Sequence, residues 1–127
     1  MVNVQASVLH FHRLDIPISS NKLTLITGTA TFDSGQEGNH TTLQINFNFK
    51  VNTIKKVTQP PIGTASLSTP HFFDSVWMTE DFTAKWNPDD KNIYCSVSIL
   101  RACTHSCRDN IEGIVFPFQV FIYHIPF

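Results

Sequence analysis

The C-terminal segment 114–125 constrains the fold more than any other part of the chain. In an extended strand, successive side chains point to opposite faces. Both faces of this segment are apolar, with Ile114, Phe116, Phe118, Val120 and Ile122 on one and Val115, Phe121, Tyr123 and Ile125 on the other. Such a strand has to be covered on both sides. It is therefore a central strand, or an edge strand whose second face meets another subunit.

The rest of the chain supplies more strands that can give this cover. Apolar and polar residues alternate without error over 42–52, and shorter alternations span 2–8, 22–32, 82–86 and 93–100. The turn-forming run 87–92 joins the last two as a hairpin. Eleven phenylalanines among 127 residues also favour sheet. We predict one domain over residues 1–127, an all-β antiparallel β-sandwich of about seven or eight strands, with a jelly roll as one form of it, rather than a closed barrel.

The N-terminal strand changes phase in its middle. Val8 continues the first apolar row, but His10 and His12 then occupy positions where the pattern expects apolar residues. Either a bulge near Val8 swaps the faces or the two histidines point inward. Pro17 is expected to end the pairing. The region 71–80 has no clear period, and we predict a loop there with at most one short strand.

The pair His10 and His12 is the best metal candidate, because imidazoles two apart lie on the same strand face and Asp15 follows closely. A His-x-His metal-dependent jelly-roll protein is thus one alternative. No third ligand can be placed from the sequence. We predict that neither a metal nor a cofactor is bound.

Three cysteines are an odd number, so at least one thiol is free or pairs with another chain. Cys103, His105 and Cys107 are too closely spaced to wrap one zinc ion easily. A disulfide within the set Cys95, Cys103 and Cys107 is favoured over a metal, and plain buried thiols are favoured over both.

Charge and motifs exclude several classes of function. A formal net charge of -1 without a basic run argues against nucleic-acid binding. No apolar run is long enough for a membrane helix, so we predict no membrane insertion. No phosphate loop, nucleophile elbow or metalloprotease motif is present, and we predict that the protein is not an enzyme. The N-terminus does not read as a signal peptide, and the sequence leaves cytosolic, virion and secreted locations open, with extracellular or virion localisation slightly favoured.

Two functions then compete. The first is a lectin-like carbohydrate-binding module that uses loops 33–40 and 71–81 or the amide-rich face of 42–52. Its predicted ligand-binding residues are Asp33, Asn39, His40, Asn46, Asn48, Asp74 and Trp77. The alternative is an assembly protein, such as a capsid, cement or fibre component, whose interface residues are Phe121, Tyr123 and Ile125. The expected partner is a glycan or a protein, and we expect a homo-oligomer. Asn39 also begins a glycosylation tripeptide, whose use the sequence does not decide.

Overall fold

The structure is a computed structural model that describes residues 2–33, 41–68, 75–104 and 111–125. This part of the chain consists of strands, turns and irregular segments and contains no helix. The strands are β1 (Val2–Ile18), β2 (Asn21–Phe32), β3 (Thr42–Asn52), β4 (Ile62–Leu67), β5 (Ser75–Asn87), β6 (Asn92–Cys103) and β7 (Val115–His124).

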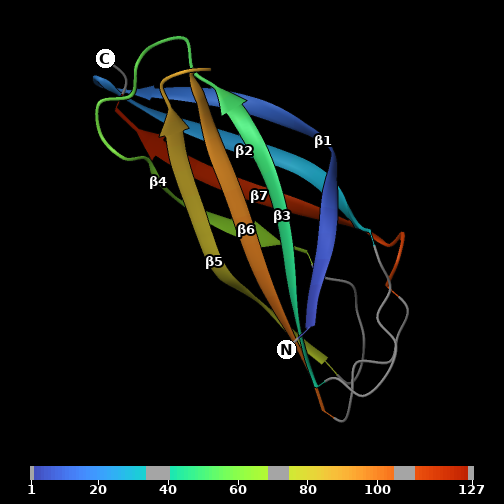
Figure 1. Ribbon diagram of the computed structural model, residues 1–127. Coiled ribbons are helices and arrows are strands. Elements are labelled where there is room, and N and C mark those ends of the chain that lie inside the picture. Colours follow the sequence, from blue (N-terminus) through green and yellow to red (C-terminus); the bar gives the residue numbers. More distant parts are fainter. Residues whose placement is uncertain (1, 34–40, 69–74, 105–110, 126–127) are drawn as a thin grey trace.

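All seven strands belong to one sheet, in the order β4-β7-β2-β1-β3-β6-β5 (Figure 1). Strand β1 pairs with a strand on each side, β2 and β3. Residues 2–5 pair in parallel with β3, and residues 6–18 pair antiparallel with β2. The two edge strands, β4 and β5, lie close to each other, so the sheet is nearly barrel-shaped.

The all-β class and the number of strands are confirmed. The sheet is mixed rather than purely antiparallel, because β1 and β3 run in the same direction. A sandwich or jelly-roll arrangement is not confirmed, since one continuous sheet joins all the strands. The doubly apolar segment forms β7, which lies between β2 and β4 as an interior strand.

The core lies between the half of the sheet that contains β3 and β6 and the half that contains β2 and β7. The error-free alternation over 42–52 predicts a strand with one buried face, and this is confirmed by the burial of every second residue from Leu43 to Val51. Phe47 is 5.0 Å from Phe118 and 5.8 Å from Phe116, measured between ring centroids. Aromatic rings therefore join the two halves across the core.

A β-bulge at Leu9 explains the change of phase in β1. Val8 pairs with Ala30 and His10 pairs with Thr29, so Leu9 is the extra residue. The bulge confirms the first of the two predicted alternatives, and the side chains of His10 and His12 are exposed. Gly28 pairs with Phe11, two residues after the bulge, and a Cβ atom on it would approach the backbone oxygen of His10 to 2.5 Å. Only glycine fits this approach without movement of the backbone.

Two strands are longer than predicted. β1 continues past Pro17, which pairs with Lys22. Proline is tolerated there because β1 pairs with β3 only over its first residues, and its other edge is open beyond them. β5 begins at Ser75, inside the segment predicted as a loop. A bulge at Glu80 interrupts its alternation, which hides the period in the sequence.

Side chains bridge the places where backbone pairing stops. Between β1 and β3, the Phe11 and Phe49 rings lie 5.9 Å apart, and Arg13 donates a hydrogen bond to the backbone oxygen of Asn52. Between β4 and β5, the ring of Phe82 approaches so closely that a Cβ atom on Gly63 would lie 2.7 Å from it. At these two places the nearly barrel-shaped sheet is thus closed by side-chain contacts rather than by backbone hydrogen bonds.

Candidate functional site

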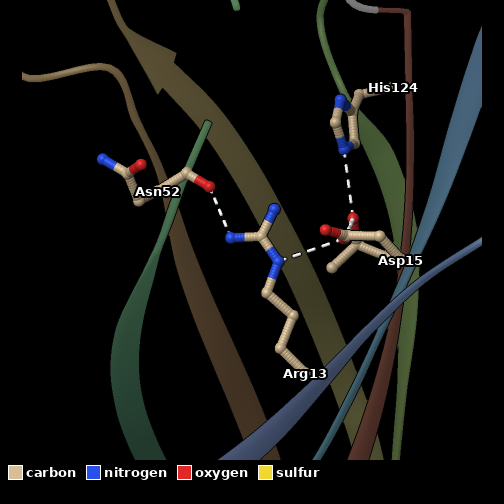
Figure 2. Close-up of polar contacts among 5 residues, drawn as sticks. Arg13, Asp15, Asn52 and His124 are labelled. Carbon is tan, nitrogen blue, oxygen red and sulfur yellow. Dashed lines mark hydrogen bonds and ion pairs between the residues drawn. The ribbon is translucent and has the colours of Figure 1, made fainter. Parts of the chain in front are cut away.

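A polar cluster on β1, β2 and β7 has two exposed members, Arg13 and Asp15, and two buried members, Thr24 and His124 (Figure 2). We call Arg13, Asp15, Thr24 and His124 the end cluster. Asp15 Oδ1 accepts hydrogen bonds from Arg13 Nε at 3.0 Å and from Thr24 Oγ1 at 2.8 Å. His124 Nε2 lies 3.1 Å from the same threonine oxygen. Asp15 and Thr24 are direct cross-strand neighbours, so strand register places them together.

The hydrogen bonds determine which imidazole nitrogen carries the proton. Because the Thr24 hydroxyl donates to Asp15, its oxygen accepts from the Nε2–H of His124. Burial lowers the pKa of His124, the positive charges of Lys22 and Arg13 lower it further, and the Asp15 carboxylate opposes them. Burial also opposes the charged form of Asp15, but hydrogen bonds from Arg13 and Thr24 and the charges of Arg13 and Lys22 keep its pKa below the ordinary value.

The end cluster is better suited to structure than to catalysis. Thr24 is 0% exposed and His124 is 3% exposed, so a substrate has no access to the hydroxyl that the histidine contacts. A nucleophile or general base has to reach the reacting atom. We therefore assign the cluster to holding β1, β2 and β7 together.

A second feature is the outer face of β4, β7, β2 and β1, which we call the apolar face. Cross-strand pairing places its central residues in two rows. The rows are Leu14, Leu25, Phe121 and Thr64, and Ile16, Leu23, Tyr123 and Ile62. Ile18 extends this surface at the end of β1. Ile62 is 67% exposed, Leu14 56% and Phe121 37%.

No charged side chain interrupts the apolar face. At the described outward positions of these four strands, from His10 and Thr31 to Ile18 and Asn21, there is no Lys, Arg, Asp or Glu. Uncharged polar residues such as Thr27 and Gln119 surround the apolar centre. A shallow hollow of about 280 Å³ lies between Ile62 and Phe121. Large exposed apolar surfaces of this kind are typical of interaction sites.

The predicted interface residues have different environments. Phe121 and Tyr123 belong to the two rows of the apolar face. Ile125 follows the last residue of β7 and is half-buried.

A third feature lies on the outer face of β3, β6 and β5. The residues that line a groove of about 520 Å³ include Asn48, Lys50, Thr83, Lys85, Tyr94 and Ser96, and we call it the tyrosine groove. Register places Tyr94 between Lys50 and Lys85, with Ser96 in the next row between Asn48 and Thr83. The groove thus combines an aromatic ring, ammonium groups, hydroxyls and an amide.

The ring of Tyr94 is exposed but held in position. Its side chain is 42% exposed, and its hydroxyl donates a hydrogen bond to Asp90 Oδ2. Asp90 Oδ1 also accepts from the backbone N–H of Asn92 at 3.1 Å. The shared hydrogen bond raises the pKa of Tyr94 and lowers the pKa of Asp90. A ring fixed in this way loses little freedom when a ligand stacks on it.

The structure brings only part of the predicted ligand set together. Asn48 lines the tyrosine groove, and Asn46 is two residues away on the same strand face. The Trp77 side chain points toward the core, away from the tyrosine groove. Its ring is half-buried, 5.9 Å from the Phe32 ring, with the Arg101 guanidinium 5.0 Å from its centroid.

Asp33 is exposed at the end of β2, away from the groove, and accepts a hydrogen bond from Ser7. Asn39, His40 and Asp74 lie outside the described residues.

Sequence reasoning missed the residues that dominate the groove. Nothing in the alternation over 93–100 links Tyr94 to Lys50 or Lys85. The pairing of β3 with β6 connects residues that lie from 40 positions (Asn52 and Asn92) to 60 positions (Thr42 and Ala102) apart along the chain. Local alternation carries no information about such register.

The metal candidates are not joined by a third ligand within the described residues. The rings of His10 and His12 lie 6.0 Å apart in an edge-on arrangement, and His10 Nδ1 contacts the Thr29 hydroxyl. No group of three or more histidine, cysteine, aspartate or glutamate side chains there could hold a metal ion.

The cysteines differ from one another. Cys95 is a free, buried thiol as expected, and burial raises its pKa to about 12. The expectation of a plain thiol is wrong for Cys103, which is disulfide-bonded. Cys107 and His105 lie outside the described residues.

Comparisons with protein-family models, with characterised proteins and with solved structures find nothing that matches this chain. The part of the chain that the structure describes has no helix that is long and apolar enough to cross a membrane.

Proposed function

We propose that the protein is a non-enzymatic assembly module that pairs with a second copy of itself through the apolar face. The observation that carries this proposal is the pair of apolar rows that crosses four strands without a charged residue at the described positions. An apolar centre with a polar rim, depleted of charge, is the composition of a protein interface. A face without charge also brings no like charges together when two identical copies meet.

The size of the face suits a dimer. Four strands spaced about 4.8 Å apart, over about ten residues that each rise about 3.3 Å, cover roughly 600 Å². A standard interface buries about 800 Å² on each partner. The apolar face therefore approaches the area that a stable pair requires, and nearby loops need to add only a modest share.

Within this proposal, the two halves of the sheet act as the two layers of a sandwich-like domain. One outer surface is the apolar face, and the other contains the tyrosine groove. The disulfide at Cys103 favours an oxidising environment, such as the outside of a cell or a virion surface.

Sedimentation velocity over a hundred-fold range of protein concentration tests the proposal. We expect the weight-average mass to rise from one chain toward two. A single-chain mass across the whole range would reject self-association through this face.

The second candidate function is carbohydrate binding by the tyrosine groove. An exposed, fixed Tyr94 ring beside Asn48 and Ser96 favours it, because amides and hydroxyls suit sugar hydroxyls and aromatic rings suit sugar faces. A glycan array with folded protein tests it, with Tyr94→Ala as the matched loss-of-ring variant. No glycan binding above background, or binding that Tyr94→Ala leaves intact, would reject the groove as a sugar site.

A further inference from the structure

Two lysines flank the aromatic ring of the tyrosine groove on neighbouring strands. Lys50 of β3 and Lys85 of β5 both pair with Tyr94 of β6. Their backbones are therefore separated by twice the strand spacing, about 10 Å. Both residues are exposed and line the same groove. Two cationic groups thus face solvent on either side of one ring.

Within the described residues, neither ammonium group forms an ion pair, since no carboxylate there lies within salt-bridge distance of Lys50 or Lys85. The Asp90 carboxylate is close enough for Lys50 to contribute to the lowering of its pKa, so Asp90 offsets part of the charge on that side. Two ammonium groups beside a ring, with no ion-pair partner in the described part of the chain, favour a ligand that carries negative charge.

We propose that the tyrosine groove binds an anionic saccharide, with a sugar ring stacked on Tyr94 and carboxylate or sulfate groups contacting Lys50 and Lys85. This inference rests on the second candidate function, the binding of sugar in this groove. The second row, Asn48, Ser96 and Thr83, provides donors and acceptors for the sugar hydroxyls.

The same geometry makes other polyanions poorer ligands. Nucleic acid requires an extended basic surface, and this chain has a formal charge of -1 with two lysines in the groove. A short anionic oligosaccharide needs only a few charged contacts, and two lysines about 10 Å apart on either side of one aromatic ring can provide them. The groove and the apolar face lie on opposite halves of the sheet, so a dimer would display two grooves outward.

Titration calorimetry with a heparin tetrasaccharide tests the inference, with its fully desulfated, N-acetylated form and inorganic sulfate as separate ligands. We expect binding of the sulfated form, weakened at least about ten-fold in the double variant Lys50→Gln/Lys85→Gln because charge-assisted contacts are lost. Tyr94→Ala should weaken it as well. The matched control is Lys55→Gln/Lys56→Gln, which removes two exposed lysines outside the groove.

The variant Asp90→Asn tests whether the groove prefers a negatively charged ligand. Removal of this negative charge should strengthen binding of the sulfated sugar relative to a neutral sugar, whose binding reports any loss of the hydrogen bond that positions the Tyr94 ring. Equal binding of the desulfated form would overturn the inference while leaving sugar binding intact. Equal losses in the groove and control double variants, or inorganic sulfate binding as tightly as the tetrasaccharide, would also overturn it. Absence of binding to every saccharide tested would reject the second candidate function itself.

Discussion

Replacement of Phe121 by aspartate is the sharpest test of the apolar face. Phe121 lies in the row between Leu25 and Thr64, and 37% of it is exposed in the single chain. In a symmetric pair, each copy presents this residue to the same surface of the other. The substitution therefore acts twice in one interface.

The magnitude follows from the exposed fraction. Complete burial of a phenylalanine side chain contributes about 1.5–3 kcal/mol, so covering the exposed third contributes about 1 kcal/mol in each copy. The aspartate variant loses this burial contribution. It also places two carboxylates in an apolar contact, which costs several kcal/mol unless they remain hydrated. We expect dimerisation to weaken by at least about 3 kcal/mol, or about 100-fold in Kd.

Sedimentation equilibrium of the wild type and Phe121→Asp measures the effect, and circular dichroism establishes that the variant is folded. Val76→Asp is the matched control, because Val76 is 64% exposed on β5, outside the apolar face. Leu14→Asp, in the same row as Phe121, should reproduce the loss. The reasoning is refuted if folded Phe121→Asp and Leu14→Asp dimerise as tightly as the wild type, or if Val76→Asp weakens the dimer equally.

Three further outcomes are expected. Gly28→Ala should lower the free energy of unfolding by about 1–3 kcal/mol in urea titrations, because the new Cβ would meet the backbone of His10; an unchanged midpoint would contradict the tight approach. Burial holds the pKa of His124 in the folded protein below the ordinary histidine value of 6.5. As the pH falls through about 6.5, the unfolded chain takes up a proton that the folded chain resists, so the free energy of unfolding should decrease. His124→Gln should make melting temperatures less dependent on pH between 7 and 5, and equal slopes would exclude this role. The Cys95 thiol, with its pKa raised to about 12, should react with a thiol reagent only after unfolding, and rapid labelling of the native protein would argue against its burial.

Local patterns in the sequence predict much of the strand content. The alternation over 42–52 identifies β3 and its buried face, because a half-buried strand needs the apolar residues at every second position. The turn over 87–92 correctly predicts the β5–β6 hairpin, in which Asn87 pairs with Asn92. The interrupted phase after Val8 leaves two alternatives, a bulge or inward histidines, and the structure shows the bulge.

Features that depend on distant pairing are missed. The parallel contact between residues 2–5 and β3 leaves no local pattern, since each strand alternates in the same way with either direction of pairing. The end cluster unites Asp15, Thr24 and His124 from three strands, and no spacing along the sequence links them to one another. The tyrosine groove is missed for the same reason, because it exists only when β3, β6 and β5 adopt their observed register.

The dual pairing of β1 also determines how the chain can be divided. A cut at the Leu9 bulge would release residues 2–8, which pair with β3 over 2–5 and with β2 over 6–8. The longer fragment would keep the pairing of residues 10–18 with β2 but would lose the only backbone pairing that joins β1 to β3 among the described residues. We therefore expect the two halves of the sheet to be held together less firmly in that fragment, and addition of a peptide of residues 1–8 to restore stability.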